Sequence, residues 1–432
     1  MDPITFSPFL GVLLLLFLGG GIWVAVSLLL ISIIGMWSVT SAPVTLVMPQ
    51  TYWSALSGWT LTALPLFVWM GEILFRSRLS DDLFQGLAPW VTRLPGRLLH
   101  VNVLGCGVFA AVSGSSAATA ATVGRMSLPE LKARGYDERI SVGSLAASGT
   151  LGLLIPPSIM MIVYGVSANV SIGRLFIAGV FPGLMLMALL MGYIAIWALL
   201  HPGKMPALVE RMTWRERLYR LRLLLPVVFL IVAVIGSIYG GYATPTEAAS
   251  LGVAGSLIIA FVSGGMDRVA FRESLYGATR TSCMIGFIIG SAAFLTSVMG
   301  YSGIPRALAN LINSYGLTAY PLLAALTLLF LILGCFLDGI SIIVLTISIV
   351  LPMAQAAGID PLWFGVYMVL VVEIAQITPP VGFNLFVVQL LTGRNIFYVA
   401  KATAPFFVMM LIGVAILITF PAIATWLPAQ MM

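Results

Sequence analysis

Apolar stretches long enough to cross a lipid bilayer recur along the whole chain and limit what it can fold into. A transmembrane helix needs roughly 20 apolar residues. Hydrophobic residues make up 60% of the 432 residues and charged residues only 8%, too few charges to cover a soluble protein of this length. We predict an all-α polytopic membrane protein. Examples of such stretches are Phe9–Ile34, Leu175–Leu199, Leu223–Ser237, Ala248–Val262, Leu322–Phe336 and Ala404–Ile423.

An internal repeat divides the chain. The pattern Leu-Pro, five residues, Gly, one residue, Asp, eighteen residues, Pro-Pro occurs twice without a gap, at an offset of 223 residues. The first copy contains Leu128-Pro129, Gly135, Asp137, Pro156-Pro157 and Pro182, and the second contains Leu351-Pro352, Gly358, Asp360, Pro379-Pro380 and Pro405. This agreement predicts two structurally related units.

The two copies differ in the charge of their loops. The loop Arg125–Arg139 carries four Lys or Arg residues, whereas its counterpart Val350–Trp363 carries none. Cytoplasmic loops collect Lys and Arg, so the first unit's loops are predicted to face the cytoplasm and the second unit's to face outward. The segments before the two units differ in the same way: the first is preceded by Arg76, Arg78, Arg93 and Arg97, and the second only by Arg306 in Ser302–Tyr315. The central loop is also predicted to be cytoplasmic, because it carries Lys204, Arg211, Arg215, Arg217, Arg220 and Arg222. Inverted repeats are typical of secondary transporters.

Each unit contains a polar break between two apolar arms. In the first, Ser113-Gly114-Ser115-Ser116 separates Val101–Val112 from Ala117–Val123, and neither arm can span a bilayer alone. In the second, Asp338-Gly339 aligns with Ser115-Ser116. A re-entrant hairpin with its tip near mid-membrane fits both, although small serines also serve close helix packing. A carboxylate at such depth usually needs a cation or a polar cavity.

A proline pair interrupts a helix in each unit. Adjacent prolines remove two backbone donors and end the preceding helix. In a protein-lined cavity, Na⁺ can bind the released carbonyl oxygens, and the following half-helix can face an anion with its N-terminus. A kink used only for packing is the alternative. Polar residues near the two breaks are Ser148, Thr150 and Ser158, and Glu373, Thr378 and Asn384.

Other motifs favour structure over chemistry. Thr244-Pro245-Thr246-Glu247 has the capping-box pattern of a helix start. The two histidines form no HExxH motif, and the chain has no P-loop. Asp137 lies in a charged loop, which argues against an intramembrane aspartyl protease. We therefore expect no enzyme and no cofactor, and membrane topology explains the net charge of +6 better than nucleic-acid binding does.

With these motifs in order, the chain resembles the large membrane subunit of tripartite ATP-independent periplasmic (TRAP) transporters over nearly its whole length. The matching stretches are His100–Val103, Ser113–Gly124, Gly135–Asp137, Gly152–Gly165, Ala168–Ser171, Thr244–Ala249, Phe336–Asp338, Gly358–Pro361 and Thr378–Phe386. Many relatives carry an acidic residue in the first hairpin where this chain has Thr119.

The resemblance implies an elevator-type symporter that uses Na⁺ as its coupling ion. It implies a first Na⁺ site at Ser113, Ser115, Ser116, Thr150 and Pro156, and a second at Asp338, Gly339, Thr378, Pro379 and Gly382. The substrate, a small organic acid, is expected near Ser116, Ser158, Glu373 and Asn384. The implied partners are a small four-helix membrane subunit and a periplasmic substrate-binding protein, in a bacterial inner membrane.

These inferences divide the chain into four parts. Residues 1–94 are predicted to form N-terminal scaffold helices and 95–200 the first transport repeat, with one hairpin and one broken helix. Residues 201–316 are predicted to hold the central loop, scaffold and arm helices, and 317–432 the second repeat. A channel or passive pore on the same architecture is the alternative function, but the sequence shows no ring of like charges and no repeated filter motif.

Overall fold

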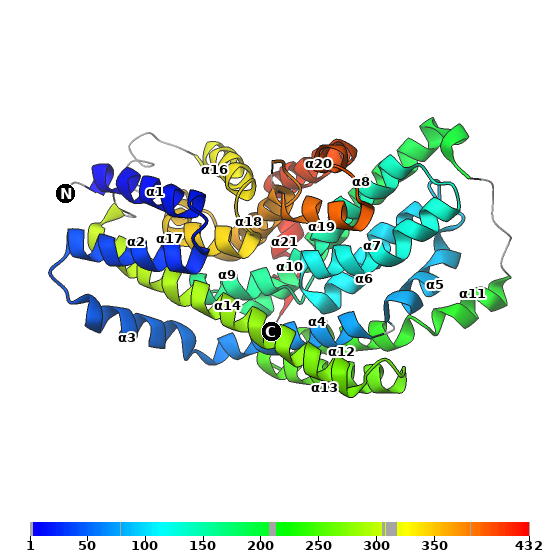
Figure 1. The fold of residues 1–432 in the computed structure, drawn as a ribbon, viewed down its shortest axis with the longest axis horizontal. Helices are drawn as coiled ribbons and strands as arrows, with labels where there is room; N and C mark the ends of the chain where they lie inside the picture. Colours follow the sequence, from blue (N-terminus) through cyan, green and yellow to red (C-terminus); the bar gives the residue numbers. More distant parts are fainter. Residues whose placement is uncertain are drawn as a thin grey trace.

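The computed structural model describes residues 3–77, 79–206, 213–304, 307, 318–380 and 382–431. Those residues form α-helices joined by turns and short 3₁₀ segments, without a strand (Figure 1). The prediction of an all-α chain is therefore confirmed for the described part. Arg78, Arg211 and Arg306, which contributed to the charge argument, lie outside the described residues.

Among the described residues, five helices are long and apolar enough to cross a membrane. They are α10 (Ile172–Leu200), α13 (Pro245–Val262), α14 (Arg268–Ser302), α17 (Gly339–Ala356) and α20 (Ile396–Thr419). Two bent pairs raise the number to as many as seven: α3 (Val44–Leu56) with η1 (Trp59–Thr62) and α4 (Ala63–Arg76), and α11 (Trp214–Leu221) with α12 (Leu225–Tyr239). The chain is a multi-pass membrane protein.

One side of the molecule is built from the segments before and between the repeats. Helix α4 packs against α13 and α14, and α14 also packs against α2 (Val24–Val39) and α3. Helix α1 (Pro3–Gly19) lies on α2, and α5 (Leu79–Val91) joins this side to the first repeat through α6. Figure 1 shows α3, α14, α13 and α12 along one long edge of the molecule. The predicted helix start at Thr244 is confirmed, because α13 begins there with a complete capping box.

The helices of the two repeats correspond at the offset found in the sequence. Helix α7 (Ser116–Ala133), shifted by 223 residues, has the bounds of α17 (Gly339–Ala356). The other elements correspond within a few residues: α6 (Leu99–Ser113) with α16 (Ala319–Gly334), α8 (Glu138–Gly149) with α18 (Pro361–Ala375), α9 (Ile159–Ala168) with α19 (Phe383–Thr392), and α10 with α20. The sequence repeat is thus also a structural repeat.

Both diprolines interrupt a helix, as the sequence predicts. In the first repeat α8 tightens into η2 (Thr150–Leu153), and α9 starts only after Pro156-Pro157. In the second repeat α18 ends at Ala375, and α19 starts after Pro379-Pro380. Both Pro-Pro bonds are cis. The helices before and after each pair are therefore halves of one interrupted element.

The two interrupted helices run in opposite directions. Glu138, the first residue of α8, pairs with Arg394, which lies just after the end of α19. At the other end, Tyr164 near the end of α9 donates a hydrogen bond to the Pro361 carbonyl, at the start of α18. Packing between the repeats is likewise reciprocal, α7 with α19 and α17 with α9, α8 with α20 and α18 with α10. This pattern is that of two units related by a two-fold axis.

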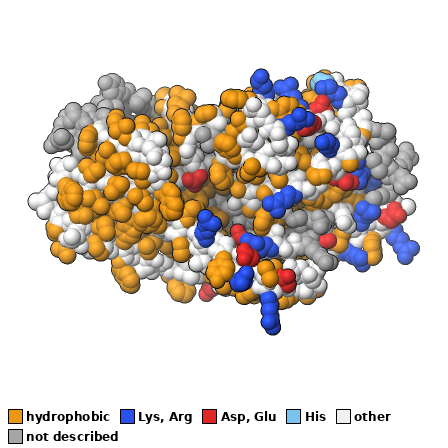
Figure 2. All heavy atoms as spheres, in the orientation of Figure 1, with side chains coloured by type: hydrophobic (Ala, Val, Ile, Leu, Met, Phe, Trp, Pro, Cys, Tyr) orange, Lys and Arg blue, Asp and Glu red, His pale blue; other side chains and the backbone are white. Residues whose placement is uncertain are grey.

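The charged and apolar surfaces occupy different ends of the molecule. Figure 2 shows Lys and Arg spread over the half of the molecule that includes α5, α7 and α11 in Figure 1, whereas the opposite part, over α2 and α3, shows many hydrophobic side chains and no Lys or Arg. Large exposed apolar side chains there include Trp37, Leu46 and Trp53. An apolar surface of this extent fits contact with lipid, and the basic end fits the cytoplasmic side predicted for the first repeat's loops.

Candidate functional site

The tip of the first hairpin is a short turn closed by its own hydroxyl groups. Helix α6 ends at Ser113, Gly114 adopts a left-handed conformation with φ of 60°, and the Ser115 side chain caps α7 by accepting from the Ala118 N–H. The Ser113 and Thr119 hydroxyl oxygens lie 2.8 Å apart, and Thr119 donates to the Ser115 carbonyl at 2.7 Å. Thr119 is fully buried, and its hydroxyl completes the turn.

This first tip lies directly against the first helix break. A methyl group on Gly152 would come within 2.7 Å of the Ser115 carbonyl oxygen, and one on Gly114 within 2.9 Å of the Pro157 carbonyl oxygen. The absence of side chains at both glycines permits this close approach. The structure thus brings the predicted Ser113–Ser116 turn and the diproline region together.

The tip of the second hairpin is closed by a carboxylate instead. Asp338 is the N-cap of α17, where it accepts hydrogen bonds from the Ile340 and Ser341 N–H groups and from the Ser341 hydroxyl. This is the position of Ser115 in the first repeat, so both tips are helix N-caps. An Asp before a helix start is a common cap, a role that our sequence interpretation of Asp338 did not include.

The second tip also lies against its own break. The Cys335 thiol donates to the Pro379 carbonyl at 3.1 Å. A methyl group on Gly339 would lie 3.3 Å from the Gln376 side-chain nitrogen, and one on Gly382 would lie 2.9 Å from the Thr378 carbonyl oxygen. The Thr378 hydroxyl donates back to the Ile374 carbonyl, in the last turn of α18. The residues predicted for the second site therefore surround one break.

The remaining predicted residues serve other contacts. The Thr150 hydroxyl lies 2.7 Å from the Ala147 carbonyl oxygen and 2.8 Å from a Glu373 carboxyl oxygen. The Asn384 amide donates across the repeats to the Ala146 carbonyl at 3.0 Å. Ser158 caps α9 and donates to the Leu153 carbonyl, bridging the break. Thr150, predicted for the first Na⁺ site, therefore meets Glu373 and Asn384, both predicted for the substrate site, where α8 ends.

Three buried polar atoms near the second break have no hydrogen-bond partner among the described residues. They are the second carboxyl oxygen of Glu373, the side-chain nitrogen of Gln376 and the side-chain oxygen of Asn384. Buried polar atoms normally find partners, so this region has unused capacity to bind a polar ligand or an ion. Gln376 was absent from the sequence prediction, although its place between Glu373 and the diproline could have suggested it.

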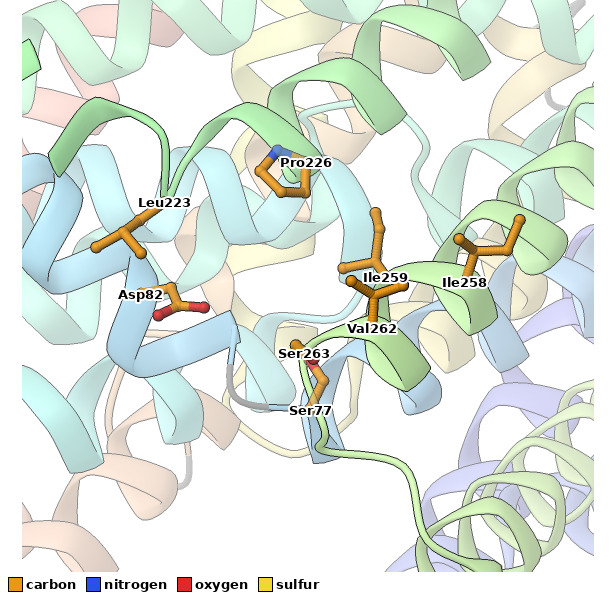
Figure 3. Close-up of a pocket in the computed structure, with 8 residues that line it drawn as sticks. All are labelled: Ser77, Asp82, Leu223, Pro226, Ile258, Ile259, Val262 and Ser263. Carbon is orange, nitrogen blue, oxygen red and sulfur yellow. The ribbon is translucent and has the colours of Figure 1, made fainter. Parts of the chain in front are cut away.

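A cavity of about 210 Å³ lies elsewhere, between α12, α13 and the α4–α5 connection. Figure 3 shows Leu223, Pro226 and Ile259 around it, with Asp82 and Ser263 at its edge. Its lining is mostly apolar, and none of the predicted ion or substrate residues belongs to it. A binding site for a charged substrate needs several convergent polar groups, so we do not assign this cavity to transport.

Ion pairs gather where the loops of the first repeat meet the end of α19. Arg394 donates two hydrogen bonds to the Glu138 carboxylate, at 2.8 and 2.6 Å. The Arg394 guanidinium, first by these hydrogen bonds and then by its charge, lowers the pKa of Glu138 below its usual value. Lys204 of the central loop pairs with Asp137 at 3.2 Å. These contacts hold three loops together at the basic end of the molecule.

Comparison with known proteins identifies the family. The family model of the tripartite ATP-independent periplasmic transporter DctM component matches residues 10–423. The chain belongs to the DctM family of TRAP transporter large subunits. It is 36% identical over 371 residues to the C4-dicarboxylate TRAP transporter large permease protein DctM of Pseudomonas aeruginosa, covering 86% of each chain. It is 33% identical to the protein of the same name from Vibrio cholerae, covering 95% of each.

Two further comparisons extend the picture. The ectoine TRAP transporter large permease protein TeaC of Halomonas elongata is 32% identical over 85% of this DctM-family chain and 86% of its own length. Among solved structures, the Alcanivorax borkumensis YdaH transporter matches with a TM-score of 0.60, covering 96% of this chain and 98% of that one, at 14% identity. This second likeness concerns the fold alone.

Proposed function

We propose that this DctM-family chain is the transport subunit of a Na⁺-coupled symporter for a small organic acid. The observation that carries the proposal is that each interrupted helix has a polar hairpin tip lying against its break, once in each of two oppositely directed repeats. Helix interruptions of this kind line the ion and substrate sites of secondary transporters. The relatives named for C4-dicarboxylates and ectoine support a small carboxylate-bearing substrate.

The first Na⁺ site is proposed between the hairpin turn and the first break. Its oxygen donors would be the Ser113 and Ser116 side chains with the Ser115 and Pro157 carbonyls, next to Pro156. Hard cations prefer such neutral and carboxylate oxygens. We leave Thr150 out of this site, because its hydroxyl already lies at hydrogen-bond distance from Ala147 and Glu373.

The second Na⁺ site is proposed around the second break. Asp338 would supply the negative charge, with the backbone around Gly339, Thr378, Pro379 and Gly382 supplying further oxygens. The Asp338 carboxylate already caps α17, so ion binding would use lone pairs that the cap leaves free. The negative charge of Asp338 would balance the positive charge of Na⁺, so this site is proposed to bind its ion more tightly than the first site does.

The substrate is proposed to lie between the two tips, near Ser116 and the unsatisfied side chains at Glu373, Gln376 and Asn384. Helices α9 and α19 begin just after the breaks, and the N-terminus of a helix stabilises a bound carboxylate. Ser158, as the cap of α9, would orient that N-terminus. Na⁺ that orders the same broken helices would raise substrate affinity, and this linkage is the coupling.

The elevator mechanism follows from the division of the molecule. Residues 95–200 and 317–432 would form the moving transport domain, and residues 1–94 and 201–316, which pack together through α4, α13 and α14, would form the scaffold. A small membrane subunit would cover the apolar surface of the scaffold in the bacterial inner membrane. A periplasmic binding protein would deliver the substrate. One relative, the isethionate TRAP transporter permease protein DctMQ of Oleidesulfovibrio alaskensis, is longer than this chain, which matches 64% of its length.

The test is substrate uptake into proteoliposomes that contain the chain with its small subunit and binding protein. Uptake should require a Na⁺ gradient and stop when Na⁺ is replaced by K⁺ or choline. Uptake that continues unchanged in choline would remove Na⁺ coupling from the proposal. Non-saturable flux that needs no binding protein would favour the alternative, a channel or passive pore.

A further inference from the structure

One hydrogen bond joins residues at equivalent positions in the two repeats. Thr150 and Glu373 are separated by 223 residues, the offset of the repeat, and their side chains lie 2.8 Å apart. In two units related by a two-fold axis, a residue meets its own counterpart only when both lie close to that axis. The Thr150–Glu373 contact therefore lies where the axis passes between the two broken helices, and we name it the axial pair.

The axial pair connects the two helices just before each is interrupted. Thr150 follows the last residue of α8 and is the first residue of η2, and Glu373 lies in the last turn of α18. Each residue precedes the first proline of its own diproline by six positions. Both side chains are completely buried. A change in the position of one helix end is thus passed directly to the other end through a bond shielded from water.

A second hydrogen bond between the repeats, close to the axial pair, is not symmetric. Asn384 donates to the Ala146 carbonyl, but its counterpart in the first repeat is Met161, which cannot return the contact. The axial pair is hence a contact to which both repeats contribute the same position, with a side chain from each.

Hydrogen counting shows which substitution preserves the axial pair. The Thr150 hydroxyl has one hydrogen but two oxygen neighbours, at 2.7 and 2.8 Å. Both contacts are satisfied when the group at position 373 donates to Thr150 and Thr150 donates to Ala147. A glutamine amide at position 373 can donate in this way, and it has nearly the shape of glutamate. Glu373→Gln is therefore the conservative variant.

We propose that the axial pair couples the two ion sites, so that Na⁺ bound at one break raises the affinity of the other. This inference rests on the proposed Na⁺ symport. Thr150 and Glu373 are positioning residues: they bind no ion themselves but transmit the ordering of one helix end to its counterpart. A coupling of this kind appears as steepness in the Na⁺ dependence of transport.

The experiment measures substrate uptake by the reconstituted complex as a function of Na⁺ concentration. Thr150→Val removes the bond and should lower the Hill coefficient of the Na⁺ dependence from its wild-type value to that of two independent sites that must both be filled. It should also raise the half-saturating Na⁺ concentration about three- to tenfold, the size of one buried hydrogen bond. Glu373→Ala should do the same, and the double variant should add little. Glu373→Gln keeps a group that can bond to Thr150, so the steepness should match that of the wild type. Its maximal uptake rate is not the readout, because the second carboxyl oxygen of Glu373 is proposed to lie near the substrate.

Thr403→Val is the matched control. Thr403 is as buried as Thr150, with 1% exposure, but its hydroxyl donates to Val399 within its own helix α20. This variant should keep the steep Na⁺ dependence. A steep wild-type curve that persists in folded Thr150→Val, or flattens equally in Thr403→Val, overturns the coupling and leaves the symport proposal intact.

A second measurement covers variants that transport too slowly to measure. Na⁺ titration of the thermal unfolding temperature of the purified chain should show cooperative stabilisation in the wild type and in Glu373→Gln, and a shallower curve in Thr150→Val. Equal curves in all three overturn the inference. Wild-type uptake that needs no Na⁺ at all would instead refute the proposed function.

Discussion

The two hairpins have second arms of 18 residues each and the same place in their repeats, yet they differ in surroundings and in chemistry. The first arm of hairpin 1, α6, is buried along almost its whole length among α4, α5, α8 and α10. The first arm of hairpin 2, α16, lies at the edge of the molecule (Figure 1), where Leu328 is 61% and Ile332 52% exposed. The enclosed tip uses hydroxyl groups, and the outer tip uses a carboxylate.

This difference teaches where the fold can place charge. A carboxylate is costly in a closed apolar environment unless it is paired. At the first tip Ser113 and Thr119 satisfy one another without any charge. At the second, Asp338 is only partly buried and is held by the N-terminus of α17, whose dipole favours the negative charge. The same hairpin turn therefore has a neutral tip inside the molecule and a charged tip near its edge.

The largest expected effect concerns how each repeat packs its hairpin on its helix. Position 334 is Gly and position 375 is Ala, whereas the equivalent positions 111 and 152 are Ala and Gly. A methyl group on Gly334 would lie 2.2 Å from the Ala375 methyl carbon. Gly334→Ala should destabilise the protein by about 1–3 kcal/mol, measured by thermal unfolding in detergent.

The rescue sharpens this comparison. Adding Ala375→Gly gives the second repeat the Ala–Gly arrangement of the first, and it should recover most of the lost stability. A Gly334→Ala protein as stable as the wild type would show that the repeats do not need complementary volumes here.

The next effect separates the cap from the charge at the second tip. Asp338→Asn keeps an N-cap, because Asn and Asp cap helices about equally well, but it removes the charge. We expect little change in thermal stability and a half-saturating Na⁺ concentration about tenfold higher, a loss of about 1.4 kcal/mol, measured by uptake. Wild-type Na⁺ dependence in this variant would refute the second ion site.

The equivalent substitution at the first tip should act differently. Ser115→Ala removes the cap of α7 at a cost of about 0.5–2 kcal/mol in stability, but the Ser115 carbonyl proposed to bind Na⁺ remains. Thermal stability should therefore fall, while the half-saturating Na⁺ concentration rises less than in Asp338→Asn. A larger Na⁺ effect at Ser115 than at Asp338 would reverse our assignment of the charged site.

The smallest effect is a pH dependence that arises at only one of the two equivalent contacts between the repeats. Arg394 holds the pKa of Glu138 below its value in the unfolded chain. The pair therefore stabilises the protein at pH values above the pKa of Glu138 in the unfolded chain. The stabilisation is lost as the pH falls through the lower, folded pKa. Because both groups are partly exposed, water and salt screen the pair and its contribution to stability is small.

Arg394→Gln tests this prediction. Its unfolding temperature should lie slightly below that of the wild type at neutral pH, and the two should converge in acid, below about pH 4. The equivalent positions in the other repeat are Pro361 and Ser171, which cannot form an ion pair, so no matching acid dependence arises there. Curves that stay parallel throughout would remove the pair from the stability of the native state.

The sequence predicted the repeat, its breaks and the hairpin tips, because prolines and glycines act on the local backbone. It also brought Ser113–Ser116 and the first diproline into one expected site. It did not predict the axial pair, since Thr150 and Glu373 are distant in sequence and only the packing of η2 against α18 makes them neighbours. An Asp directly before a helix start could have predicted the N-cap role of Asp338, but we interpreted its carboxylate as an ion ligand instead.

The most direct test of the account is a pair of experimental maps of the chain with its membrane partner, one in Na⁺ and one in choline. The account predicts two additional peaks in Na⁺, one between the Ser115 and Pro157 carbonyls and one beside Asp338 and the second diproline, both absent in choline. Identical maps, with neither break occupied in Na⁺, would contradict it.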